Sequence, residues 1–147
     1  MNRMKNRIFA NPAMSEGTIT IDQMTQGYHP TSFDRPKTIP VWFFLDDERE
    51  PPSKPDTHWV IFRNGETMIE LISRWGLPDG ISFDHDLGLN IMTGHDVAKK
   101  LVDMVLDSKL TIPDYFQFKI HSANPVGAKH IELTMNDLLR LRSITLV

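Results

Sequence analysis

Three short apolar runs in this chain end abruptly in polar or charged side chains, and this repeated pattern constrains the fold most strongly. The runs and the polar groups after them are Val41–Leu45 with Asp46–Arg49, Ile81–Phe83 with Asp84–Asp86, and Tyr115–Ile120 with His121–Ser122. Short apolar runs rich in aromatic and branched residues are typical of strands in a covered sheet. Because ionisable groups are costly to bury without partners, we expect the polar groups at the strand ends, at the surface.

The segments between these runs have the spacing and boundary signals of helices. In Glu66–Trp75 the apolar residues recur at helical intervals, and Thr93–Asp96 is a capping box that opens a second helix. Asn124-Pro125 places a capping side chain before proline at the first helical position, and we expect that helix to run to about Arg140. His58–Phe62 is a further predicted strand.

Strands that alternate with helices predict an α/β fold with a mostly parallel sheet flanked by helices. We assign this domain to residues 40–147, with Ser143–Val147 as a final strand. Residues 1–39 are rich in Asn, Thr, Pro, Gly and Met, and only Gly17–Asp22 shows the alternation of a strand. We expect this part to be an N-terminal extension that is an arm, a contact between copies of the chain or a partly mobile tail.

Composition narrows the functional classes. The chain has 147 residues, a formal net charge of −3 and no cysteine. The absence of cysteine excludes disulfides, thiolate metal sites and cysteine nucleophiles, and it suits a reducing cytoplasm. No apolar run approaches the roughly 20 residues of a membrane helix. No block of Lys and Arg follows the first few residues, so bulk electrostatic capture of nucleic acid is not indicated, whereas a small anionic ligand remains compatible.

If the sheet is parallel, the polar strand ends lie side by side along one edge, where ligands of open α/β sheets bind. Asp46 and Asp47, together with Asp84 or Asp86, would repel one another there unless a hard divalent cation accepted their oxygens. Mg²⁺ suits such a site because it needs only a few carboxylates and keeps several waters, and Mn²⁺ is the other candidate. The simpler interpretation of Asp46-Asp47 is a loop cap.

Two histidines end different strands and are expected to approach the same spot. His85 and His121 would then act as base and acid on a phosphodiester, with Asp84 beside them. The free backbone N–H groups at the start of the helix after Asn124 favour an anion, and Arg49 and Ser122 are further phosphate contacts. Each also has a structural interpretation: salt-bridge partner for Arg49, strand end for Ser122, helix cap for Asn124, and buried hydrogen-bonding partner for each histidine.

The order and spacing of several motifs resemble the cyclic-phosphate processing receiver-like domain, a divergent branch of the response-regulator receiver fold. The motifs are Phe44–Arg49, Ile81–Gly88, Thr93–Asp96 and His121–Gly127, and the resemblance covers roughly residues 40–140. It implies a flavodoxin-like sheet with an acidic pocket. Asp46 and Asp47 would match the acidic pair of a receiver, Asp84 or Asp86 its phospho-accepting position, and Ser122-Ala123 its Ser/Thr-Ala pair.

The chain also departs from an ordinary receiver. A proline-rich loop at residues 51–55 replaces the helix after the first strand, histidines stand at positions 85 and 121, and no Lys-Pro pair ends a fifth strand. These departures make phosphorelay signalling doubtful. The role that the resemblance implies, processing a cyclic phosphate on a nucleotide or an RNA end, fits the chain better.

We therefore expect a metal-assisted phosphoesterase. The expected catalytic residues are His85, His121 and Asp84, the phosphate contacts are Arg49, Ser122 and Asn124, and the metal ligands are Asp46, Asp47 and Asp86, with Asp84 as the alternative third ligand. The first alternative is a receiver-like module that binds a cyclic nucleotide or a partner protein without catalysis. The others are a phospho-accepting receiver and a structural protein with a vestigial crevice.

Overall fold

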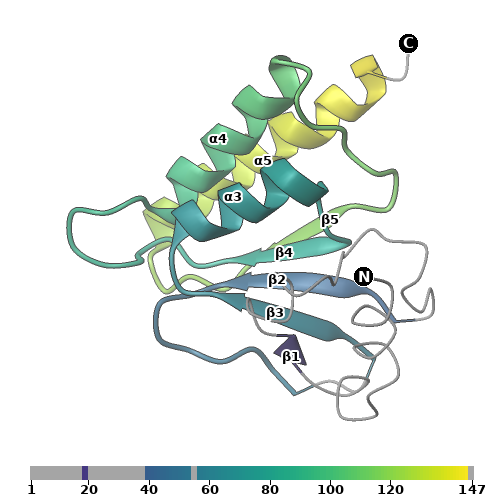
Figure 1. The fold of residues 1–147 in the computed structure, drawn as a ribbon. Coiled ribbons are helices and arrows are strands. Elements are labelled where there is room, and N and C mark those ends of the chain that lie inside the picture. Colours follow the sequence, from purple (N-terminus) through teal and green to yellow (C-terminus); the bar gives the residue numbers. More distant parts are fainter. Residues whose placement is uncertain (1–17, 20–38, 54–55, 146–147) are drawn as a thin grey trace.

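The structure of the chain is a computed structural model that describes residues 18–19, 39–53 and 56–145. These residues form a five-stranded sheet and three helices (Figure 1). The strands are β1 (Thr18–Ile19), β2 (Val41–Leu45), β3 (His58–Phe62), β4 (Gly80–Phe83) and β5 (Gln117–Ile120). The helices are α3 (Gly65–Trp75), α4 (Gly94–Leu106) and α5 (Pro125–Thr145).

The sheet is parallel throughout, with the strand order β1-β3-β2-β4-β5. In its register Phe43 lies between Val60 on β3 and Ile81 on β4, so the three central apolar runs are aligned. Parallel neighbours bring their carboxyl ends to one edge, as the argument from strand ends requires. The predicted receiver-like α/β fold is confirmed, and β2 and β3 have the predicted bounds.

The three helices share one hydrophobic core with one face of the sheet. Alternate strand residues such as Phe43 and Phe83 are fully buried there, against Met68 of α3, Leu101 of α4 and Met135 of α5. These helices lie over the sheet as a layer in Figure 1. Side chains alternate along a strand, so the intervening residues belong to the opposite face.

That opposite face carries a second, smaller cluster of Trp42, Phe44 and Trp59. The rings of Phe44 and Trp59 meet edge to face at 5.8 Å, a geometry that aromatic pairs favour. The cluster reaches to the carboxyl end of β2, because Phe44 is the last but one residue of that strand.

The helix ends follow the sequence signals. Asn64 caps α3 by accepting a hydrogen bond from the Thr67 N–H, and Gly76 ends it with a φ of 90°, in the region that favours glycine. Thr93 and Asp96 form the predicted capping box of α4. Asn124 Oδ1 accepts a hydrogen bond from the Gly127 N–H at the start of α5.

The final strand expected at residues 143–147 was wrong, because α5 continues to Thr145. No glycine or proline interrupts residues 128–145, and Leu138, Leu139 and Leu141 keep packing against the core, so the helix has no reason to end at Arg140. Residues 146–147 lie outside the described part.

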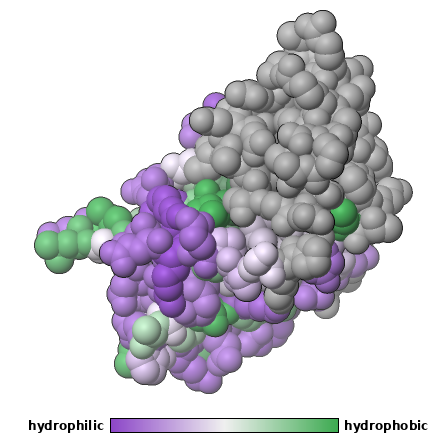
Figure 2. All heavy atoms as spheres, turned by 90° about the horizontal axis from the view of Figure 1, so that it is seen from below, coloured by the Kyte–Doolittle hydropathy of each residue, from purple (hydrophilic) through white to green (hydrophobic). Residues whose placement is uncertain are grey.

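Of the predicted extension, Thr18 and Ile19 pair with Trp59 and Val60 of β3. Residues 1–17 and 20–38, including the rest of the strand expected at 17–22 and the proposed contact between copies, lie outside the described residues. Among the described helices, none has the length and apolarity to cross a membrane. The described surface in the view of Figure 2 is mostly hydrophilic, with small separate hydrophobic areas.

Candidate functional site

Three polar residues continue the sheet by one backbone hydrogen bond beyond their strands. The Asp46 N–H donates to Phe62 O at 3.0 Å, the Asp84 N–H to Leu45 O at 2.9 Å, and the His121 N–H to Phe83 O at 2.9 Å. Because side chains alternate along a strand, Asp46 and Asp84 lie on the side of Phe44 and Ser82, away from the helices. The sheet itself therefore positions these three side chains at its carboxyl edge.

Asp46 is the most highly connected group of the site and is 1% exposed. Its Oδ1 accepts hydrogen bonds from the backbone N–H groups of Glu48 and Arg49, at 2.8 and 2.7 Å. Its Oδ2 accepts from Arg49 Nε at 2.8 Å and from His121 Nε2 at 3.0 Å. Burial alone would raise the pKa of Asp46, but these backbone and side-chain donors together lower it. Asp46 is therefore held as a carboxylate.

Arg49 bridges two carboxylates of the site. Beyond its bond to Asp46, its guanidinium lies 3.4 Å from Asp84 Oδ2, although half of the side chain is exposed. The loop that carries Arg49 is held by Arg63, which donates to the backbone oxygens of Asp46 and Arg49. The structure thus places a guanidinium directly on Asp46 and Asp84.

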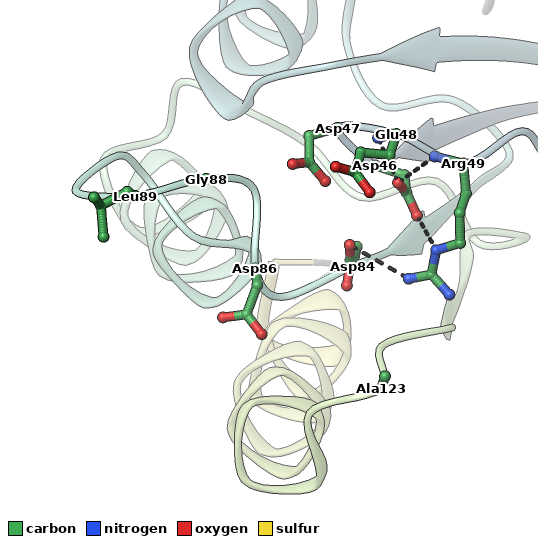
Figure 3. A pocket seen from close by; sticks show the side chains of 9 residues that line it. All are labelled: Asp46, Asp47, Glu48, Arg49, Asp84, Asp86, Gly88, Leu89 and Ala123. Atoms are coloured by element: carbon green, nitrogen blue, oxygen red, sulfur yellow. Dashed lines mark hydrogen bonds and ion pairs between the residues drawn. The ribbon is translucent and has the colours of Figure 1, made fainter.

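Asp46, Asp47 and Asp84 form an acidic cluster in which one oxygen from each residue lies within 4.8 Å of the others. The cluster opens into a pocket of about 530 Å³ (Figure 3). The pocket is lined by Asp46, Asp47, Glu48, Arg49, Asp84, Asp86, Gly88, Leu89 and Ala123. Three carboxylates at an open pocket are a ligand set that fits Mg²⁺ or Mn²⁺, since both prefer oxygen ligands and keep coordinated water.

Asp86, expected as the third metal ligand, lies apart from this cluster in Figure 3. Asp84 is the third carboxylate of the cluster, because it directly follows β4 and is still hydrogen-bonded to β2. Asp86 instead lies 3.0 Å from His85 Nδ1 and accepts a hydrogen bond from Asn124 Nδ2 at 3.2 Å. The hydrogen bonds from His85 and Asn124 lower the pKa of Asp86.

His121 lies on the side of the sheet away from the helices, with both ring nitrogens engaged. Nε2 contacts Asp46, and Nδ1 lies 2.8 Å from Ser82 Oγ. The ring stacks on Phe44 with the ring centroids 4.3 Å apart and the planes 5° from parallel. Burial lowers the pKa of His121 and outweighs the raising effect of Asp46. His121 is therefore a neutral, immobilised imidazole.

His85 follows Asp84 by one residue and consequently points to the other side, toward α5. Its ring lies so close to Gly127 that a Cβ at that position would be 2.3 Å from the imidazole Cγ. In the neutral ring Nδ1 would carry the proton, because the Asp86 carboxylate at 3.0 Å is closer to it than Asn124 Nδ2 at 3.5 Å. Nε2 would then have a lone pair, and no described hydrogen-bond donor contacts it. We expected the two imidazoles to approach the same spot, but in the structure His85 and His121 have separate sets of contacts.

The predicted phosphate contacts Ser122 and Asn124 have structural roles in this structure. Ser122 Oγ accepts a hydrogen bond from the Asn124 N–H at 3.0 Å, and Asn124 caps α5. Sequence reasoning missed Ser82 and Arg63. The signal for Ser82 was a hydroxyl inside the apolar run Ile81-Ser-Phe83. No sequence pattern pointed to Arg63.

Comparison with known proteins gives a family and little else. No curated protein matches the chain. A solved structure, titled as a trimeric coiled-coil segment of yeast Spc42 (amino acids 181–211) fused to another structure, has 20% identity and a TM-score of 0.44. The match covers 65% of this chain and 62% of that one, and its TM-score is too low to establish a shared fold. The cyclic-phosphate processing receiver domain matches residues 41–137, which is most of the chain. This chain therefore belongs to the cyclic-phosphate processing receiver domain family.

Proposed function

We propose that the domain is a metal-assisted phosphoesterase that opens a cyclic phosphate on a nucleotide or an RNA end. The observation that carries this proposal is the acidic cluster of Asp46, Asp47 and Asp84 at the mouth of an open pocket. Family membership supports the class of substrate. The volume of the pocket, about 530 Å³, is within the range typical of small-ligand sites.

Asp46, Asp47 and Asp84 would hold the cation, Mg²⁺ or Mn²⁺. When bound, such an ion supplies Lewis-acid stabilisation of a phosphoryl oxygen. Asp46 needs no deprotonation for this, because its hydrogen bonds already keep its pKa low. A metal ion at the carboxylates would replace Arg49 as their counter-charge. The guanidinium could then bind two oxygens of the phosphate, a geometry that it favours.

Of the two histidines, His85 is the one with a ring nitrogen outside any described hydrogen bond, and its partner Asp86 lines the pocket. Opening a cyclic phosphate by hydrolysis adds a water oxygen to phosphorus and breaks one ester P–O bond. The free Nε2 of His85 would take the proton from that water and return it to the leaving oxygen, while Asp86 holds Nδ1. His121 has no ring nitrogen left for substrate, so its expected role as a second proton carrier becomes a role in placing Asp46.

The test is turnover of 2′,3′-cyclic nucleotides, 3′,5′-cyclic nucleotides and cyclic oligonucleotides, each with and without Mg²⁺ or Mn²⁺. We expect hydrolysis of at least one class that depends on the cation and falls about 100-fold in the His85→Ala variant. A folded protein that turns over none of these compounds would remove the proposal.

The second candidate is a module that binds a cyclic nucleotide without cutting it. The contacts of Arg49 with Asp46 and Asp84 favour it, because they compensate the carboxylates without any metal. This alternative predicts that the protein binds a cyclic nucleotide tightly and that the ligand is recovered intact. Chelation of divalent cations should leave the dissociation constant unchanged.

A further inference from the structure

Ser82 is a buried hydroxyl that the proposed function does not use. It lies within β4, is 5% exposed, and its Oγ is 2.8 Å from His121 Nδ1. The other nitrogen of the same ring is 3.0 Å from Asp46 Oδ2. A continuous path of hydrogen bonds thus runs from the interior of the sheet to the carboxylate of the acidic cluster.

The direction of these hydrogen bonds follows from the acceptor at one end. Asp46 is a carboxylate and only accepts, so His121 Nε2 must carry a proton. In the neutral ring Nδ1 then has a lone pair, and the Ser82 hydroxyl must donate to it. Ser82 thereby selects one of the two neutral tautomers of His121, the one that points its N–H at Asp46.

Ser, His and Asp are also the residue types of a hydrolase triad, but the placement excludes that role for Ser82. Its hydroxyl is buried within β4 and is already engaged with His121 Nδ1. A nucleophile must reach the substrate, whereas a group that fixes a tautomer needs only the histidine.

We propose that Ser82 is a positioning residue that acts through His121 to orient the Asp46 carboxylate toward the cation. Phe44 assists by holding the plane of the ring through stacking. Outer hydrogen bonds of this kind typically change metal affinity by about 10- to 100-fold when they are removed. The part of the proposal that concerns the cation rests on the proposed function, whereas the choice of tautomer does not.

The experiment has two readouts on the full chain. Imidazole ¹⁵N chemical shifts of the metal-free protein at pH 8 report the tautomer of His121, and electron paramagnetic resonance measures the dissociation constant for Mn²⁺. We expect the wild type to show the Nε2–H tautomer and Ser82→Ala to show a mixture, with Mn²⁺ bound about tenfold more weakly. Ser73→Ala, an exposed serine-to-alanine change on α3, is the matched control and should alter neither.

A double-mutant cycle separates action through His121 from a general loss of packing. The His121→Gln variant keeps an N–H donor without tautomers, so adding Ser82→Ala to it should change Mn²⁺ affinity less than twofold. Equal effects of Ser82→Ala in both backgrounds would overturn the proposal, as would an unchanged tautomer. If Ser82→Ala does not fold, Ser82→Cys replaces it, because a thiol is a weaker hydrogen-bond donor. The same changes in tautomer and Mn²⁺ affinity are then expected of Ser82→Cys. A wild type that binds no Mn²⁺ removes the proposed metal site, and the ¹⁵N shifts then decide the role of Ser82 alone.

Discussion

Replacing Arg49 by methionine should tighten the binding of Mn²⁺ to the acidic cluster about tenfold. In the structure the Arg49 guanidinium lies 2.8 Å from Asp46 Oδ2 and 3.4 Å from Asp84 Oδ2, and both carboxylates belong to the acidic cluster. A metal ion must therefore displace these contacts before it can bind. Methionine keeps most of the length of the side chain and removes its charge.

The magnitude follows from the two ion pairs that are lost. Arg49 is 51% exposed, so each pair contributes only about 0.2–1 kcal/mol after screening by solvent. Two such pairs amount to about 1 kcal/mol. The variant also removes the repulsion between the guanidinium and a nearby divalent ion, which adds a similar amount and is weakened by salt. Since 1.4 kcal/mol is a factor of ten, tenfold tighter binding is the central expectation.

Titration with Mn²⁺ at low ionic strength, followed by electron paramagnetic resonance or calorimetry, measures this effect. Without metal the variant should also unfold at a lower temperature, because the carboxylates lose their counter-charge, and Mn²⁺ should restore the difference. Arg74→Met is the matched control, since Arg74 forms an exposed pair with Glu70 on α3. Equal or weaker Mn²⁺ binding by Arg49→Met would refute the view that Arg49 occupies the cation position.

Two further predictions concern the helical side of the site. Gly127→Ala should place a Cβ 2.3 Å from the His85 ring. We expect turnover to fall at least tenfold and the free energy of unfolding in urea to fall by about 1–3 kcal/mol. Wild-type kinetics in this variant would show that the ring can shift without loss of activity. The pKa of His95 is lowered from 6.5 by burial first and by Lys99 and His130 next, so its contribution to stability is present above pH 6.5 and lost as the pH falls toward the lower folded value. In thermal unfolding between pH 8 and 5, His95→Gln should therefore show a shallower decline than the wild type, and identical slopes would contradict this assignment.

Several of the strands and the acidic edge were predictable because each depends on local pattern. The runs 41–45 and 58–62 are so apolar that only a covered strand suits them, and Asp46 and Asp84 follow such runs directly. The placement of Asp84 and His85 on opposite sides of the sheet was also available from the sequence in principle. Asp84 and His85 are consecutive residues after a strand, so they must face opposite sides.

The remainder depends on register and on distant contacts. The bond between Ser82 and His121 joins residues 39 positions apart and exists only because Ser82 lies opposite Lys119 in the β4–β5 pairing. No local pattern states that register. The final segment misled for a different reason: Ser143–Val147 is rich in β-branched residues. Its residues 143–145 nevertheless continue a helix that is already packed on the core.

The backbone bonds that extend the sheet at Asp46, Asp84 and His121 have a consequence for how such a protein can diversify. The key side chains are anchored to the scaffold and not to the connecting segments. A segment such as residues 87–92, of which Gly88 and Leu89 line the pocket, can change in length or composition and alter which molecule enters, while Asp46, Asp84 and His121 keep their places. A new ligand preference can therefore arise in this scaffold while these three side chains stay in place.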